Sequence, residues 1–165
     1  MKLPALFCIW LVACAGLRAA EPLPIERQVE AAVASPRATV VHFWAPWCAN
    51  CAFELATGGW AGFIDRNPKV NVVFITVWHG GDGDGRAALA KNGVGLQKNF
   101  QLLYHPNGSR REAEKMTTFL GQPVQSVPTT WIYRDGKLRY ALNYGEVRFP
   151  ILQQLVEDAV ESWDR

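Results

Sequence analysis

Cysteine is scarce in this chain. Only four of its 165 residues are cysteines, and two of these, Cys8 and Cys14, lie within the first 20 residues. The rest of the chain holds a single pair, Cys48 and Cys51, which would close a very short loop if it were oxidised. Because a disulfide restrains the unfolded chain less when its loop is short, this pair would be a poor structural staple. The pattern excludes a disulfide-stabilised scaffold and favours a pair that carries chemistry.

An excess of charge is also missing. The chain carries 17 basic and 15 acidic residues, and removal of the first 20 residues, with Lys2 and Arg18, would leave 15 of each sign. Such a balance excludes the kind of basic surface that binds nucleic acid, so no nucleic-acid partner is expected. A length of 165 residues with 49% hydrophobic content is typical of one globular domain.

The first 20 residues differ in character from the rest. They include one early basic residue, Lys2, followed by an uncharged apolar run from Leu3 to Leu17. The run is short for a membrane span and has the order of a secretory signal peptide. We therefore predict a signal peptide over residues 1–20 and a folded domain over residues 21–165. A buried or anchoring N-terminal helix is the alternative.

Several cleavage patterns overlap in this segment. The stretch from Leu11 to Cys14 resembles the lipobox of bacterial lipoproteins, in which the cysteine after the cleavage point carries the lipid. Ala13, Cys14 and Ala15 equally fit ordinary signal-peptide cleavage, and cleavage after Ala20 is a third option. The sequence thus predicts a periplasmic or other extracytoplasmic protein, with lipid on Cys14 as a candidate membrane anchor.

Apolar patterns divide the remaining chain into helices and strands. The predicted elements, in chain order, are a helix over 25–35, a strand over 38–45, a helix over 48–66 weakened at Gly58 and Gly59, a strand over 70–78, a loop over 79–86, a short helix over 86–92, a strand over 100–104, a helix over 110–120, a hairpin of strands over 129–133 and 138–142, and a helix over 149–162. This order predicts an α/β sandwich with a mixed β-sheet.

The pair Cys48 and Cys51 falls where the first strand gives way to a helix. Unpaired N–H groups and the dipole at a helix N-terminus favour a thiolate, so Cys48 is the predicted nucleophile. Cys51, one turn further along, would lie shielded inside the helix and resolve the mixed disulfide that Cys48 forms. A zinc site would need two more ligands, and His42, His79 and His105 are widely scattered.

Two motifs at opposite ends of the domain carry a family resemblance. "FWAPWCANC" followed by "SVPTTWIYRDGK" resembles the thioredoxin superfamily, and the C-x-x-C-x-x-E pattern resembles its TlpA/ResA/DsbE-type branch of exported thiol:disulfide oxidoreductases. The resemblance covers about residues 25–162. It implies a thioredoxin-like three-layer sandwich, in which helices flank the mixed sheet. It also implies no metal and no cofactor beyond the redox-active disulfide Cys48–Cys51.

The resemblance implies roles for further residues. Pro128, after Val127, occupies the position of a cis-proline that lies beside the cysteine pair and positions the substrate backbone. A trans-proline that opens an edge strand is the alternative. Glu54 matches an acid that accepts or relays the proton of the buried thiol. The alternative is an exposed glutamate, which is favoured in the early turns of a helix.

Three ring-bearing residues complete the candidate site. His42 occupies a position that holds a buried Asp in thioredoxins and often Asn in the branch. It would tune Cys51, carry its proton, or remain a neutral core histidine. Trp44 and Trp47 would flank the site as packing and substrate-contact surfaces.

The resemblance also implies an activity. The branch mostly reduces disulfides in other exported proteins, for example in cytochrome c maturation, with electrons from a membrane thiol transporter of the DsbD or CcdA type. Ala49 and Asn50 between the cysteines differ from the family's usual pairs and influence the reduction potential, so a disulfide-forming oxidant is the first alternative. A Cu(I)-binding metallochaperone is the second, because two soft sulfur atoms can hold that ion.

Overall fold

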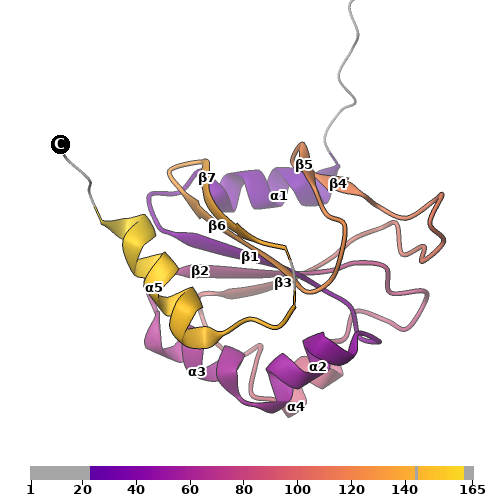
Figure 1. Ribbon diagram of the computed structural model, residues 1–165, viewed down its shortest axis with the longest axis horizontal. Helices are drawn as coiled ribbons and strands as arrows, with labels where there is room; N and C mark the ends of the chain where they lie inside the picture. The colour runs from indigo at the N-terminus through magenta and orange to yellow at the C-terminus, as the bar shows by residue number, and fades with distance from the viewer. Residues whose placement is uncertain (1–22, 144, 162–165) are drawn as a thin grey trace, which may run out of the picture.

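The computed structural model describes residues 23–143 and 145–161. Its centre is a five-stranded sheet in the order β3-β2-β1-β6-β7 (Figure 1). These strands are β1 (Thr39–Trp44), β2 (Asn71–Thr76), β3 (Phe100–Tyr104), β6 (Thr129–Arg134) and β7 (Lys137–Leu142). β1, β2 and β3 run parallel, whereas β6 is antiparallel to both β1 and β7. The predicted signal peptide over 1–20, with Cys14, lies outside the described residues.

Helices cover both faces of this mixed sheet. They are α1 (Pro24–Val33), α2 (Ala49–Ala56), α3 (Gly59–Arg66), α4 (Arg86–Lys91) and α5 (Phe149–Val160), and a small separate hairpin consists of β4 (Thr118–Phe119) and β5 (Gln122–Pro123). Figure 1 shows α1 and the hairpin on one face and the other four helices on the opposite face. The predicted three-layer α/β sandwich is therefore confirmed. None of the helices in the described ranges is both long and apolar enough to cross a membrane.

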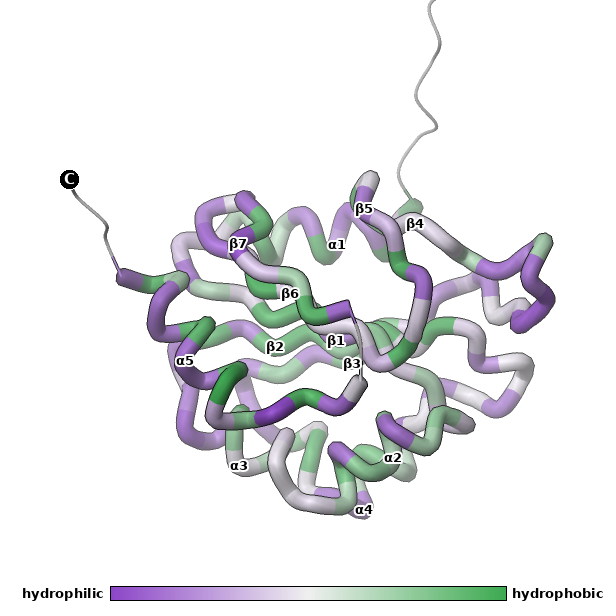
Figure 2. The backbone as a smooth tube through the Cα atoms, viewed as in Figure 1, coloured by the Kyte–Doolittle hydropathy of each residue, from purple (hydrophilic) through white to green (hydrophobic). Residues whose placement is uncertain are grey.

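The sheet separates two hydrophobic cores. On one side Val29 of α1 and Phe119 of β4 pack with residues of the central strands. On the other side Leu55 of α2, Trp60 of α3 and Leu152 of α5 form the second cluster. In Figure 2 the hydrophobic colour accordingly runs along the central strands, whereas hydrophilic residues are frequent in the outer loops.

The central strand β1 determines which residues face the site. All six of its residues are buried, as an apolar run in a doubly covered strand should be. Because side chains alternate along a strand, Val41 and Phe43 join the core under α1, whereas Val40 and Trp44 join the core under α2, α3 and α5. His42 falls between Val40 and Trp44 in this alternation, so its imidazole lies on the side of α2.

The helix predicted over 48–66 is divided into two. α2 ends at Ala56, and Gly58 adopts a φ of 68°, which side-chain-bearing residues rarely take. α3 then starts at Gly59, so the break occurs at the weak point that the two glycines predict. With one exception, the other predicted elements lie within a few residues of their expected bounds.

The exception is the helix predicted over 110–120, which is wrong. Residues 111–115 form a single turn, in which the N–H of Lys115 donates to the carbonyl of Arg111 at 2.8 Å. The chain then enters the β4–β5 hairpin, where Leu120 and Gly121 both adopt positive φ. Phe119 is fully buried there. Burial of this aromatic ring in a two-residue hairpin overrides the local helix propensity of the preceding residues.

Gly59 sets the distance between α3 and α5. A Cβ at this position would lie 1.9 Å from Cε2 of Phe149, the first residue of α5. We expect Gly59→Ala to lower the free energy of unfolding by about 1–3 kcal/mol, the usual cost of overpacking a core. Gly62→Ala in the same helix is the control, because it would meet only the flexible end of Arg66 at 3.0 Å. Urea denaturation measures both variants, and equal stabilities would contradict this close approach.

Candidate active site

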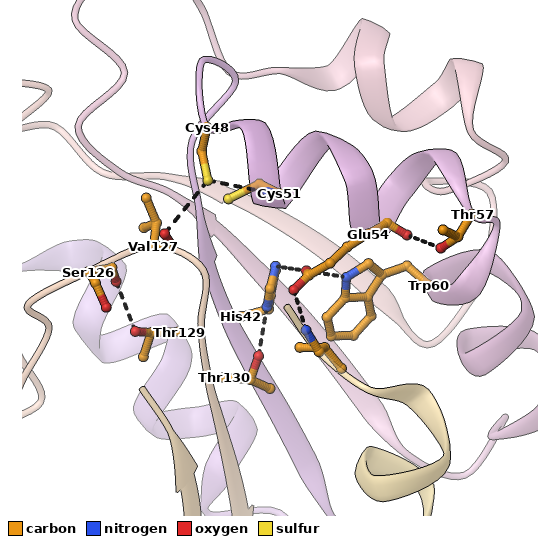
Figure 3. A network of polar contacts seen from close by, with 11 residues as sticks. His42, Cys48, Cys51, Glu54, Thr57, Trp60, Ser126, Val127, Thr129 and Thr130 are labelled. Carbon is orange, nitrogen blue, oxygen red and sulfur yellow. Dashed lines mark hydrogen bonds and ion pairs between the residues drawn. The ribbon is translucent and has the colours of Figure 1, made fainter. Parts of the chain in front are cut away.

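Cys48 forms the N-terminal cap of α2. Its backbone is extended, with φ −76° and ψ 116°, and its Sγ accepts a hydrogen bond from the N–H of Cys51 at 3.2 Å (Figure 3). Side-chain oxygens of serine and aspartate cap helices in the same way, and their acceptor is here replaced by sulfur. The predicted position of Cys48 at a helix N-terminus is confirmed.

The pKa values of the two thiols shift in opposite directions. A hydrogen bond from the Cys51 thiol, helped by the N–H groups of Cys51 and Asn50, lowers the pKa of Cys48 to about 7, although burial opposes the shift. The hydrogen bond with Cys48 and burial raise the pKa of Cys51. Both thiols are free, and Cys51 is 1% exposed compared with 6% for Cys48. Near neutral pH the pair therefore combines one thiolate that can attack with one protonated thiol behind it.

The loop before β6 lies against the reactive sulfur. The peptide bond between Val127 and Pro128 is cis, as the family resemblance implies, and the trans alternative is excluded. The carbonyl oxygen of Val127 lies 3.7 Å from Cys48 Sγ and accepts a hydrogen bond from it when Cys48 is protonated (Figure 3). Thr129 Oγ1 donates to the carbonyl of Ser126 at 2.8 Å and so ties the loop to the start of β6. A polypeptide that approaches Cys48 therefore meets Val127 as well.

Glu54 lies on α2, one turn beyond Cys51, and is 1% exposed. Its Oε1 accepts a hydrogen bond from the N–H of Val147 at 2.5 Å, and its Oε2 accepts one from Trp60 Nε1 at 3.0 Å. The exposed glutamate that the sequence allows is thus excluded. Burial raises the pKa of Glu54 to about 7, although the two hydrogen bonds act against the shift. A carboxyl group that titrates near neutral pH can both accept and donate a proton there.

His42 lies beside Glu54 in the same buried layer. Its Nε2 is 3.4 Å from Glu54 Oε2, and its Nδ1 is 2.9 Å from Thr130 Oγ1 (Figure 3). The imidazole packs against Trp60 and Phe74, with ring centroids 4.4 Å and 4.6 Å away. Burial lowers the pKa of His42 to about 3, so the ring is neutral at ordinary pH. His42 is therefore a neutral core histidine that contacts a carboxyl group.

Solved structures with this arrangement of sheet and helices identify the fold. A secreted Mycobacterium tuberculosis disulfide oxidoreductase homologous to E. coli DsbE matches with a TM-score of 0.54 at 21% identity, over 77% of this chain and 85% of that one. StoA from Bacillus subtilis matches with a TM-score of 0.51 at 19% identity, over 73% and 83%. A thioredoxin-family thiol:disulfide interchange protein from Chlorobium tepidum matches with 0.57 at 15% identity, over 79% and 85%.

The chain has a thioredoxin fold. At these sequence identities the likeness establishes the architecture, which is the one that the two sequence motifs indicate. No protein-family model matches the chain, and no curated protein matches its sequence.

The two tryptophans near the cysteines of this thioredoxin fold are not equivalent. Trp44 is 2% exposed and packs against Phe74, so it contributes packing and does not offer the substrate-contact surface predicted for it. Its Nε1 has no hydrogen-bond partner among the residues that the structure describes. Trp47 is 46% exposed, and its Nε1 donates to the carbonyl of Trp78 at 2.6 Å. Trp47 is therefore the tryptophan that a substrate can reach.

Three residues that contact the buried side chains of Glu54 and His42 are not predicted from the sequence. Trp60 and Val147 hold the carboxyl group of Glu54, and Thr130 contacts His42. Thr130 pairs directly with His42 in the β1–β6 ladder of the thioredoxin fold, so a correct strand alignment would reveal it. Val147 contributes only its backbone N–H. Because every residue except proline has this group, the identity of the side chain could not have predicted the contact.

The remaining histidines are hydrogen-bonded to each other's segments and not to the cysteine pair. His79 Nε2 is 3.2 Å from the carbonyl oxygen of His105, and the hydroxyl of Tyr104 is 2.7 Å from His79 Nδ1. These contacts join the chain after β2 to the end of β3 and the residue that follows it. Within residues 23–143 and 145–161 there is no group of three or more His, Cys, Asp or Glu side chains that could hold a metal ion.

Proposed function

We propose that the protein is an exported thiol:disulfide oxidoreductase that reduces disulfides in other exported proteins. The observation that carries the proposal is the asymmetry of the cysteine pair. Cys48, whose pKa is about 7, caps α2 beside Val127, and Cys51, whose pKa is raised, is buried behind it. Two-step disulfide exchange needs one ionised thiol that attacks and a second that waits.

The proposed cycle has two displacements. The Cys48 thiolate attacks one sulfur of a target disulfide, forms a mixed disulfide with it, and expels the other target sulfur as a thiolate that takes up a proton. Cys51 then loses its proton and attacks Cys48 Sγ, which releases the second target sulfur. The target gains two electrons and two protons, and the protein ends with a Cys48–Cys51 disulfide.

Glu54 would take the proton of Cys51 in the second displacement. It lies one turn beyond Cys51 on α2, and its negative charge is one of the causes that raise the pKa of that thiol. Its own pKa of about 7 suits proton transfer near neutral pH. His42, which bridges Glu54 and Thr130, would hold the carboxyl group in position.

The cellular setting belongs to the same proposal. Residues 1–20 have the order of a signal peptide and include the lipobox-like position Cys14, so the protein would act in the periplasm or elsewhere outside the cytoplasm, with lipid as its anchor. A membrane thiol transporter of the DsbD or CcdA type would return electrons to the Cys48–Cys51 disulfide. Cytochrome c in maturation is the candidate target that the family resemblance suggests.

The reduction potential of the Cys48–Cys51 pair tests the direction of electron flow. We expect about −270 mV or lower, near the value of thioredoxin, because a reductant must lose electrons readily. The measurement equilibrates a chain that begins at Glu21 with defined thiol buffers and counts free thiols by alkylation and mass spectrometry. A potential near about −120 mV would contradict the reducing direction and favour an oxidant of newly exported chains.

A further inference from the structure

A hollow of about 330 Å³ opens beside the reactive sulfur. Its walls include Trp47, which directly precedes Cys48, and Val127, whose carbonyl accepts from Cys48 Sγ. Trp78, Arg110 and Lys115 also line it. A chain segment joined to Cys48 through a mixed disulfide would therefore have this hollow next to it.

The aromatic part of the lining is held in place by hydrogen bonds. Trp47 Nε1 donates to the carbonyl of Trp78 at 2.6 Å, and Trp78 Nε1 donates to the carbonyl of Met116 at 2.8 Å. Trp78 also adopts a φ of 46°, a left-handed conformation that few residues other than glycine take. Both indole rings are thus oriented before any ligand arrives.

Two cations lie over these rings. The guanidinium of Arg110 is 4.9 Å from the centroid of Trp47, and Lys115 Nζ is 5.0 Å from the centroid of Trp78. Arg110 Nε also donates to the carbonyl of Trp78 at 3.2 Å. Cation–π contacts of this length hold a positive group over the ring and leave its outer side available. Of the described residues that line the hollow, the charged ones are both positive.

The acids that neutralise these cations lie outside the lining. Asp82 pairs with Arg110, and Glu112 pairs with Lys115 at 2.8 Å. The side chains of Asp82 and Glu112 are 52% and 86% exposed. Arg110 is itself 44% exposed, so water screens its pair with Asp82, which contributes little free energy. Lys115 is 17% exposed, and water reaches its pair from the side of Glu112. A carboxylate that enters the hollow can therefore compete with both acids, and replaces Asp82 at the smaller cost.

Building on the proposed function, we propose that this hollow selects target polypeptides with an aspartate or glutamate next to the reactive cysteine. The two cations supply the complementary charge, and the two indoles hold them in place. Complementary charge at an interface mainly raises the rate of productive encounter and discriminates against targets of the opposite sign. The same surface disfavours a target with lysine or arginine at that position.

Three matched peptides test the proposal with the reduced full chain. Each carries one cysteine joined to 2-mercaptoethanol by a disulfide, and they differ only in having Glu, Gln or Lys beside that cysteine. Cys48 attacks the peptide disulfide and Cys51 resolves the product, so each peptide yields peptide thiol, 2-mercaptoethanol and the oxidised protein. The rate with each peptide is divided by the rate at which dithiothreitol reduces the same peptide. This ratio removes differences in the intrinsic reactivity of the three peptide disulfides. We expect the Glu peptide to react about fivefold faster than the Lys peptide, with a smaller ratio at high salt.

Variants locate the origin of the selectivity. Lys115→Gln should lower the Glu-to-Lys ratio clearly but leave it above one, because Arg110 still lies over Trp47, and Lys115→Arg should preserve the full ratio. Lys137→Gln on β7 removes the same charge from an exposed position outside the hollow and should leave the ratio unchanged. Equal rates for the three peptides with the original chain would overturn the inference, as would equal effects of Lys115→Gln and Lys137→Gln. No reaction with any peptide would instead overturn the proposed function.

Discussion

Replacing Cys51 with serine should convert the protein from a catalyst into a trap. Cys48 would still attack a target disulfide, but no second thiol would resolve the mixed disulfide, so turnover should fall by on the order of 10³-fold or more. The measurement incubates each reduced variant, freed of dithiothreitol, with insulin and follows the release of reduced insulin by mass spectrometry under non-reducing conditions. Cys51→Ser should instead show one insulin molecule attached to Cys48.

Replacing Cys48 with serine should remove both turnover and the covalent complex. Serine is itself a good N-terminal cap, so α2 should still begin at the same residue, and circular dichroism should be unchanged. Cys51 is 1% exposed and its pKa is raised, so it should not substitute as the nucleophile. Retained turnover in Cys48→Ser would refute the redox mechanism. Loss of bound copper in both variants without any trapped disulfide would instead support the Cu(I) alternative.

The position of the cysteine pair could be predicted because local rules govern it. An apolar run that must be buried on both faces forms β1, and the chain after a buried strand turns into a helix whose first N–H groups need an acceptor. Cys48 supplies that acceptor, and helical spacing alone then places Cys51 inside α2 and Glu54 one turn further. None of these steps requires knowledge of a distant part of the chain.

The surroundings of the pair depend on contacts between distant segments. Strand alternation could place His42 on the same face as Trp44, but its contact with Glu54 results from how α2 crosses that face. Local sequence patterns could not predict the hollow beside Cys48 either. It needs Arg110 and Lys115, which lie in a segment where burial of Phe119 replaces the predicted helix by a turn and a hairpin.

The second large effect concerns the variants His42→Asn and Glu54→Gln. We expect their free energies of unfolding to depend on pH in opposite directions. The pKa of Glu54 rises from 4.5 in the unfolded chain to about 7 in the folded protein, and that of His42 falls from 6.5 to about 3. Between about pH 4.5 and 6.5 the unfolded pair therefore carries one proton on His42, and the folded pair carries one proton on Glu54. The proton count is unchanged by folding, so the pair adds no slope to stability in this range.

Each variant removes one of the two opposing contributions to the pH dependence of stability and leaves the other. In His42→Asn only Glu54 remains, and its raised pKa contributes stability that is present below pH 4.5 and is lost as the pH rises towards about 7. In Glu54→Gln only His42 remains, and its lowered pKa contributes stability that is present above pH 6.5 and is lost as the pH falls towards about 3. Between about pH 4.5 and 6.5, the free energy of unfolding should change by up to about 1.4 kcal/mol per pH unit, falling with pH in His42→Asn and rising with pH in Glu54→Gln.

The proton on Glu54 also needs a hydrogen-bond acceptor, and His42 is the residue that can provide one. The protonation of Glu54 therefore depends on His42. Among the described residues, Trp60 Nε1–H and the N–H of Val147 contact the carboxyl group and can only donate, whereas His42 Nε2 can accept. The protonated Glu54 would donate to this nitrogen, and Nδ1–H of His42 would then donate to Thr130 Oγ1. Urea denaturation of the original chain and both variants at half-unit steps between pH 4.5 and 6.5 measures the slopes relative to the original. Slopes of the same sign in the two variants would show that His42 and Glu54 do not share one proton.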